Sequence, residues 1–240
     1  MKFVNLLYHR ETRSPLLALT FASLISVLLV SVRVATTRDF HWAFLVWNLF
    51  LAWLPLVLAL LACEQFRAGR ANGWKLGALS GAWLLFFPNA PYICTDVIHV
   101  VYRSHRYFWV DLMLILLFAV IGLVLGFVSL YLMQSLVRRR FGQIAGWLFV
   151  AGVAGLSGFG IYLGRFLRFN SWDIVARPMK LYHGISNWAA NPLANSNTGT
   201  FPLLFAIFLL LAYVMLYTLT HLPKPYDATS SSVSGELKAA

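Results

Sequence analysis

The chain has 240 residues, of which 60% are hydrophobic and 11% are charged, and its mean hydropathy is +0.73. Because soluble globular domains carry roughly a quarter charged residues, this composition excludes an ordinary soluble domain. The formal net charge is +11, but the basic residues are scattered among short polar segments, which excludes a nucleic-acid-binding surface. We therefore expect an integral membrane protein whose main partner is the lipid bilayer.

Six apolar segments are long enough to cross a bilayer, since a hydrocarbon core about 30 Å thick needs roughly 20 apolar residues of helix. They are Pro15–Val32, Ala43–Cys63, Leu76–Ile93, Trp109–Met133, Gln143–Leu163 and Phe201–His221. They predict an all-α fold, an integral bundle of six transmembrane helices that forms one domain over residues 1–222. Residues 223–240 are rich in Ser, Pro and Ala without apolar periodicity and predict a disordered tail.

The basic leader before the first segment also fits a signal peptide. No small-residue cleavage pattern follows that segment, so we expect a retained span. Six spans place both termini on one side of the membrane, together with the basic run at residues 138–140. Because Lys and Arg are enriched in cytoplasmic loops, we expect both termini and the tail in the cytoplasm.

The third segment contains the stretch FFPNAPYICTDVIHV, residues 86–100. Pro88 and Pro91 lack an amide proton, and each disfavours helical geometry in the residue before it. We therefore expect the third helix to break at these prolines, near the outer face of the membrane. Asn89 is predicted to cap a second helix that has Pro91 in its first turn.

If that second helix continues, Tyr92, Asp96, His99 and Arg103 lie on one face, because their offsets are 4, 7 and 11 residues. A phenol, a carboxylate, an imidazole and a guanidinium in line form a binding surface or a proton relay. Asp96 and His99 are the candidate catalytic pair. The alternative is a polar helix end solvated by lipid headgroups, but polar groups within a membrane are costly and usually functional.

Asp96 and His99 are also candidate metal ligands. Their i, i+3 spacing is the spacing of carboxylate and histidine ligands in helical-bundle metal sites. Two ligands do not make a site, so His105, His41 or Asp111 would have to complete it, with His105 as the third candidate. The sequence identifies no cofactor.

Other segments supply partners for this face. Asn48 is a polar residue in the second segment, where the alternative role is a hydrogen bond between helices. The fifth segment ends with Tyr162, Arg165 and Arg168 at i, i+3 and i+6. We expect Arg165 to pair with Asp96 or with an anionic ligand, since a guanidinium binds carboxylate or phosphate through two hydrogen bonds. Arg168 fits this role or a contact with lipid headgroups.

Two further features lie in and after the fifth segment. Gly160 and Gly164 form a Gly-x-x-x-Gly pair, which is typical of close helix packing and predicts a homo-oligomer contact. Residues 171–190 predict a short amphipathic helix on the outer surface, with Asp173 in its first turn. This helix either covers the site or shields the mouth of the bundle.

The stretches WNLFLAWLP, FFPNAPYICTDVIHV and GIYLGRFLRFNSWD, in this order in a six-span chain, resemble the domain of unknown function 1361 family. The resemblance covers roughly Ala43 to Leu211. It implies a bacterial multi-pass protein of the cytoplasmic (inner) membrane, and it assigns no reaction. The matching residues are Asn48, Pro88, Asn89, Pro91, Tyr92, Asp96, His99, Gly164, Arg165, Asn170, Trp172 and Asp173.

Three classes of function fit a polar site at the outer mouth of the bundle. The leading hypothesis is the binding or transport of a small anion or a lipid headgroup. The first alternative is a membrane-embedded enzyme, a metal-dependent or acid/base hydrolase or transferase that acts on a lipid-linked substrate. The second is a non-catalytic membrane assembly factor. The chain contains no HExxH, GxSxG or glycine-rich phosphate loop, so the sequence leaves open whether it is an enzyme.

Overall fold

A computed structural model describes residues 10–67, 73–103, 106–190 and 196–221. The predicted tail, 223–240, and the candidate ligand His105 lie outside these ranges. Contacts between Cα atoms divide the chain into two units, Met1–Leu210 and Leu211–Ala240. In the second unit the last helix continues to Thr220, and the rings of Tyr217 and His221 stack with centroids 4.2 Å apart.

The secondary structure of the described residues is helical, with η marking a 3-10 helix. The elements are α2 (Arg10–Thr37), η1 (Phe40–Ala43), α3 (Phe44–Arg67), α4 (Gly73–Phe86), α5 (Asn89–Tyr92), η2 (Ile93–Val97), α6 (Ile98–Arg103), α7 (Phe108–Phe141), α8 (Gln143–Arg165), α9 (Asp173–Ala176), α10 (Pro178–Ala190) and α11 (Ser196–Thr220).

By length and composition, six helical stretches are able to cross a membrane. They are Ser14–Thr37, Phe40–Arg67, Gly73–Tyr102, Phe108–Phe141, Gln143–Arg165 and Gly199–Thr220. They coincide with the six predicted segments, most of them extended by several residues. The all-α membrane bundle is therefore confirmed, and the chain is a multi-pass membrane protein.

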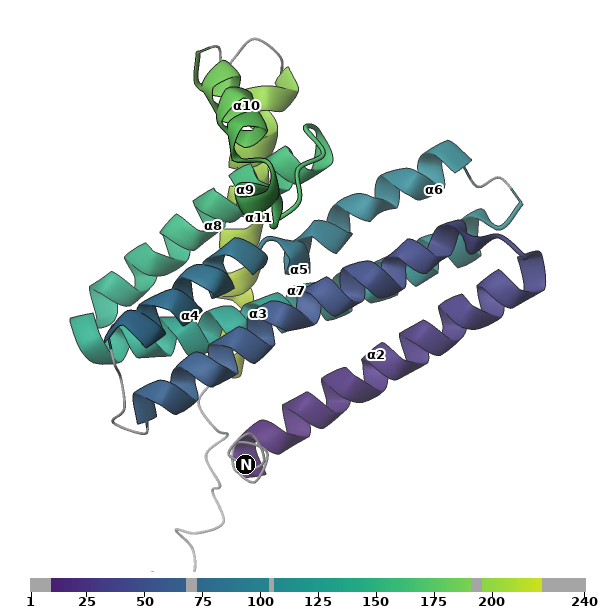
Figure 1. The fold of residues 1–240 in the computed structure, drawn as a ribbon. Coiled ribbons are helices and arrows are strands. Elements are labelled where there is room, and N and C mark those ends of the chain that lie inside the picture. Colours follow the sequence, from purple (N-terminus) through teal and green to yellow (C-terminus); the bar gives the residue numbers. More distant parts are fainter. Residues whose placement is uncertain (1–9, 68–72, 104–105, 191–195, 222–240) are drawn as a thin grey trace, which may run out of the picture. The chain divides into compact units, whose positions relative to one another are not determined.

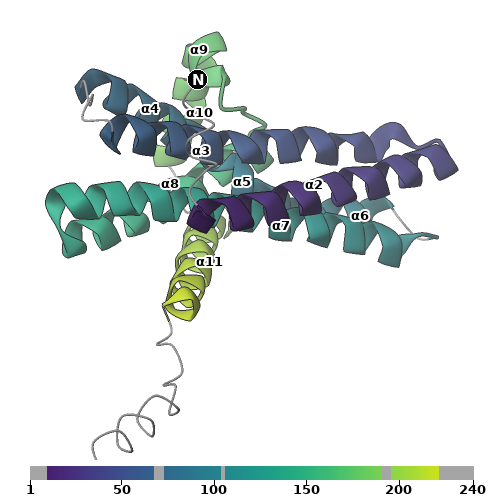
Figure 2. The same cartoon turned by 90° about the horizontal axis from the view of Figure 1, so that it is seen from below.

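Helix α7 is the centre of the first unit and packs against α2, α3, α5 and α8 (Figures 1 and 2). Its buried face includes Ile115, Phe118 and Leu125, which join Leu45 and Leu56 of α3 in one apolar core. Figure 1 also shows that α4, α5 and α6 form one interrupted path beside α3 and α7. The polar residues of the third span lie along this path.

The predicted break of the third span is confirmed, because α4 ends at Phe86, before Pro88. Asn89, however, does not cap the next helix. Pro88 occupies that position without a side-chain hydrogen bond, so the prediction for Asn89 is wrong. Its amide instead donates to the Phe86 carbonyl and to the Ser171 hydroxyl, at 3.0 Å each. Asn89 therefore satisfies the backbone that the prolines leave exposed, as membrane burial requires.

Glycines on two neighbouring helices accommodate the break. A Cβ atom at Gly122 of α7 would lie 2.6 Å from the Ala90 carbonyl oxygen. On α8, a Cβ atom at Gly160 would lie 3.1 Å from Pro88, and one at Gly164 would lie 3.1 Å from the Tyr92 ring. The Gly160–Gly164 pair thus packs against the broken span of the same chain, and the homo-oligomer contact stays a prediction.

The predicted amphipathic helix is present but shorter than expected. Arg177 leaves helical geometry, with φ −142° and ψ 54°, and so separates the single turn α9 from α10. Helix α10 buries none of its residues fully, as its surface position requires. It contacts α8 through the Trp188 and Phe159 rings, whose centroids are 4.7 Å apart.

Candidate functional site

A buried ion pair joins the broken third span to α8. Arg165, the last residue of α8, donates from Nη2 to Asp96 Oδ1 of η2 at 2.5 Å. Asp96 is 1% exposed and the Arg165 side chain is 16% exposed. The pair is one of the two partnerships that the sequence predicts for Arg165. Two opposite charges within membrane-spanning helices stabilise each other only if their remaining polar atoms are also satisfied.

Helix α3 satisfies the other carboxylate oxygen. Asn48 donates from Nδ2 to Asp96 Oδ2 at 2.8 Å. Both oxygens of Asp96 therefore have partners, one from α8 and one from α3. Three spans that are distant in the sequence meet at this single carboxylate.

The guanidinium of Arg165 is oriented by the backbone turn that carries Asp96. Its Nε donates to Thr95 Oγ1 at 3.0 Å, and the Thr95 hydroxyl in turn donates to the Tyr92 carbonyl at 2.7 Å. The guanidinium carbon also lies 4.5 Å from the centroid of the Tyr92 ring, a cation–π contact. Sequence analysis missed Thr95; its signal was a hydroxyl directly beside the candidate carboxylate.

His99 lies at the edge of this cluster. Its Nε2 is 3.9 Å from Asp96 Oδ1 and 3.4 Å from Arg165 Nη1, and its side chain is 36% exposed. The ring of His41 is 5.7 Å away between centroids. The Nε2 atom of His41 is buried and has no hydrogen-bond partner among the described residues.

The metal hypothesis gains no third ligand here. Within the described ranges, no three His, Cys, Asp or Glu side chains come close enough to hold one ion. Asp111, one of the candidates, is instead held by Arg33, with Nε–Oδ1 at 2.7 Å and Nη2–Oδ2 at 3.0 Å. With His105 outside those ranges, the Asp96–His99 metal site stays a prediction.

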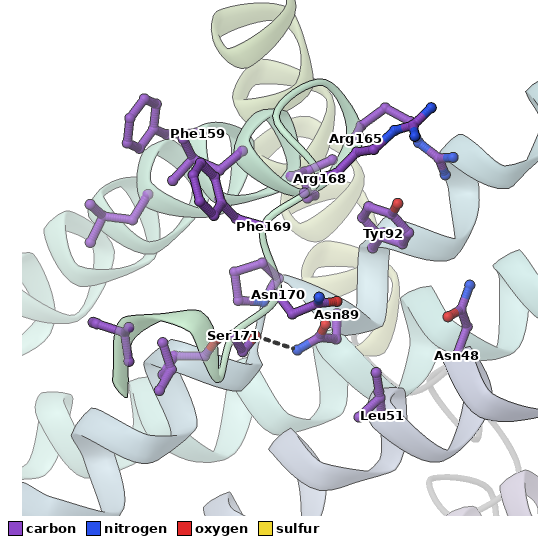
Figure 3. A pocket seen from close by; sticks show the side chains of 18 of the residues that line it. Asn48, Leu51, Asn89, Tyr92, Phe159, Arg165, Arg168, Phe169, Asn170 and Ser171 are labelled. Atoms are coloured by element: carbon purple, nitrogen blue, oxygen red, sulfur yellow. Dashed lines mark hydrogen bonds between the residues drawn. The ribbon is translucent and has the colours of Figure 1, made fainter. Parts of the chain in front are cut away.

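The cluster opens into a cavity of about 710 Å³, here called the polar cavity (Figure 3). One part of its wall is polar. It contains Asn48, Asn89, Tyr92, Asp96, His99, Arg165, Arg168, Asn170 and Ser171. The rest of the wall is largely apolar. It includes Phe44, Trp47, Leu51, Leu84, Leu85, Leu156, Phe159, Leu181 and Ile185. A pocket with this division suits an amphiphilic ligand.

A family model described as "Protein of unknown function (DUF1361)" matches residues 47–214. The chain belongs to this family. No curated protein and no solved structure matches the chain. The DUF1361 region contains Asn48, Asp96 and Arg165, whereas Arg33 lies outside it. The polar cavity is therefore built almost wholly from the part of the chain that defines the family.

Within this DUF1361 region, two predicted binding residues lie outside the cavity wall. Tyr162 is buried and its ring packs 5.2 Å from that of Phe166. Asp173 is buried and accepts a hydrogen bond from the Asn170 amide at 2.8 Å. Both residues therefore shape the segment that surrounds the cavity. The side chain of Arg103, at the end of α6, is outside the description.

Ser171 is the second residue that sequence analysis missed in this role. Its hydroxyl accepts from Asn89, the dashed contact in Figure 3, and donates to the Leu85 carbonyl at 3.1 Å. It thereby fixes the segment after α8 to the end of α4. No local pattern in the sequence indicated this role, because the partner Asn89 is 82 residues away.

Proposed function

We propose that this DUF1361 protein binds an anionic group, carried by a small anion or by a lipid headgroup, in the polar cavity. The supporting observation is that two arginines and one carboxylate line its wall: Arg165, Arg168 and Asp96. The carboxylate holds Arg165 in place, and the wall keeps one positive charge in excess. Guanidinium groups form two parallel hydrogen bonds with phosphate or carboxylate, which suits this recognition.

Arg168 is the cation available to the ligand. It is exposed, and no described acidic side chain pairs with it. Its φ of 56° is left-handed, a geometry that is uncommon for residues other than glycine and that clusters at functional sites. Figure 3 shows Arg168 and Arg165 on the same side of the cavity. The two guanidinium groups thus form the proposed anion contact.

The expected orientation places this cavity at the outer face. Helix α8 runs from Gln143 to Arg165, about 33 Å at 1.5 Å per residue, which is close to the bilayer thickness of about 30 Å. The cavity and the basic run 138–140 therefore belong to opposite faces. Because basic loops favour the cytoplasm, both termini are expected there.

Single cysteines test this orientation. In a Cys63→Ala, Cys94→Ala background, Lys180→Cys is expected to react with a membrane-impermeant thiol reagent added outside cells. Arg140→Cys is expected to react only after the membrane is permeabilised. The reversed pattern would overturn the orientation and leave the anion site itself to be tested by binding.

Binding is tested with the purified protein in detergent. Inorganic phosphate and dihexanoyl phosphatidylglycerol are titrated separately, with the change in intrinsic tryptophan fluorescence as the readout, because Trp47 lines the cavity. Arg168→Gln is expected to weaken binding about tenfold, the equivalent of one lost charged contact of roughly 1.4 kcal/mol. Phosphate binding would identify a small-anion site, and binding of the phospholipid alone would identify a headgroup site.

Arg38→Gln is the matched control. Arg38 is also exposed, also has a left-handed φ (53°), and is not among the described residues that line the polar cavity. Its replacement is expected to leave binding unchanged. Equal affinities of the wild type and Arg168→Gln, or equal losses in both variants, would refute the proposed site.

The enzyme hypothesis has one observation in its favour. The imidazole of His99 is partly exposed in the polar cavity and lies beside the Asp96 carboxylate. This arrangement fits acid/base chemistry on a lipid-linked substrate. Turnover of a bound lipid by the wild type that is lost in His99→Gln, with binding retained, would move the protein to this class.

A further inference from the structure

We propose that the ligand is a long-chain anionic lipid, whose hydrocarbon tail runs from the polar cavity into a second, apolar cavity nearer the opposite face. This inference rests on the proposed anion site and names the class of molecule that carries the anion. It is argued from the residues that line both cavities, the apolar character of the second cavity, and the absence of a side chain at Gly81.

The second cavity, here called the apolar cavity, has a volume of about 310 Å³. Side chains of α3, α4, α7 and α8 line it. They are Phe66, Leu76, Ser80, Gly81, Trp83, Leu84, Met133, Leu136, Val137, Arg140, Phe141 and Phe149. Apart from the Ser80 hydroxyl and Arg140, its wall offers hydrocarbon and aromatic surface. Away from these two residues a headgroup would lose its hydration without compensation, whereas an acyl chain would not.

The two cavities share part of their walls. Gly81 and Leu84, both on α4, line the polar cavity and the apolar cavity alike. On α8, Arg165 lies at the polar end, and Phe149 lines the apolar cavity 16 residues earlier. That separation is about 24 Å of helix, most of the roughly 30 Å hydrocarbon thickness. A ligand that fills both cavities therefore needs a long tail.

Gly81, one of the two residues common to both walls, is exposed and leaves open space where a side chain would lie. A Cβ atom at Gly81 would meet nothing within 4 Å, although Gly81 lines both cavities. A side chain placed there would start beside residues of both cavities without its Cβ displacing a protein atom. Gly81 therefore contributes only backbone to the two cavity walls, which leaves room for an acyl chain to pack closely against α4.

Gly77 provides a matched control one helical turn earlier on α4. A Cβ atom there also meets nothing within 4 Å, and Gly77 is not among the described residues that line either cavity. Substitutions at both glycines remove the same backbone flexibility and add the same side chain. Under this proposal, only the substitution at Gly81 obstructs the path of the lipid tail.

The test is photo-crosslinking of the full chain in phosphatidylcholine nanodiscs. One phosphatidylglycerol probe carries a diazirine at the end of an acyl chain, and a second carries it next to the headgroup. Adducts are mapped by mass spectrometry. In the wild type the distal probe is expected to label the wall of the apolar cavity, including Phe149, and the proximal probe to label the polar cavity, including Phe159.

Gly81→Phe is expected to lower distal labelling of the apolar cavity about tenfold and to leave proximal labelling unchanged. Gly81→Leu, a smaller change, is expected to act in the same direction, and Gly77→Phe should behave as the wild type. Unchanged distal labelling in both Gly81 variants, or distal labelling spread evenly over exposed α2 residues, would overturn the tail path. The anion site is tested separately, with the probe that carries its diazirine next to the headgroup. Equal labelling by this probe in the wild type and in Arg168→Gln would contradict the anion site.

Discussion

Two buried arginine–aspartate pairs in this protein share almost every local feature. Arg33 and Arg165 each bind a carboxylate that is 1% exposed. Each guanidinium also lies 4.5 Å above a tyrosine ring, that of Tyr107 or Tyr92. Each donates to a threonine hydroxyl, that of Thr37 or Thr95. The chemistry of the two pairs alone does not tell one from the other.

The surroundings of the two pairs differ. Arg33 binds both oxygens of Asp111 and so joins α2 to α7, and neither residue is among the described residues that line the polar cavity. Arg165 binds one oxygen of Asp96 and leaves the second to Asn48, while the pair lines a cavity of about 710 Å³. The Arg33–Asp111 pair, here called the closed pair, holds two helices together. The Arg165–Asp96 pair, here called the open pair, lies beside a cavity and is able to meet a ligand.

The largest expected effect comes from breaking the closed pair. Arg33→Met leaves the Asp111 carboxylate buried without its cation, which is expected to cost about 3–5 kcal/mol. Thermal unfolding of the purified protein in detergent measures this loss. The double variant Arg33→Met, Asp111→Leu removes both charges and is expected to recover most of the stability, with anion binding unchanged throughout. A single variant as stable as the wild type would show that this pair does not clamp the bundle.

Breaking the open pair is expected to have a smaller effect on stability and a larger one on binding. Arg165→Gln removes hydrogen bonds to a charged group, roughly 1.5–3 kcal/mol, while Asn48 still donates to Asp96, which lines the polar cavity. The double variant Asp96→Asn, Arg165→Gln is expected to unfold near the wild-type temperature but to lose anion binding. If this double variant bound dihexanoyl phosphatidylglycerol as the wild type does, the open pair would not be part of the site.

Much of the fold was predictable because membrane helices leave a local record in the sequence. The six spans follow from runs of about 20 apolar residues, and the break follows from Pro88 and Pro91, which act on their own backbone. The role of Asn89 was mispredicted for the same reason. A cap is a local interaction, while its actual partner Ser171 comes from a segment 82 residues later.

The sequence by itself determined the class of protein, the number of spans, the position of the break and a short list of polar residues that includes Asp96 and Arg165. These features depend on hydropathy, on proline geometry and on residue type, which act over a few turns of chain. Only the tertiary structure decided which arginine meets which aspartate, and that Thr95 and Ser171 support the site. Those contacts join residues up to 86 positions apart, and helix packing alone brings such residues together.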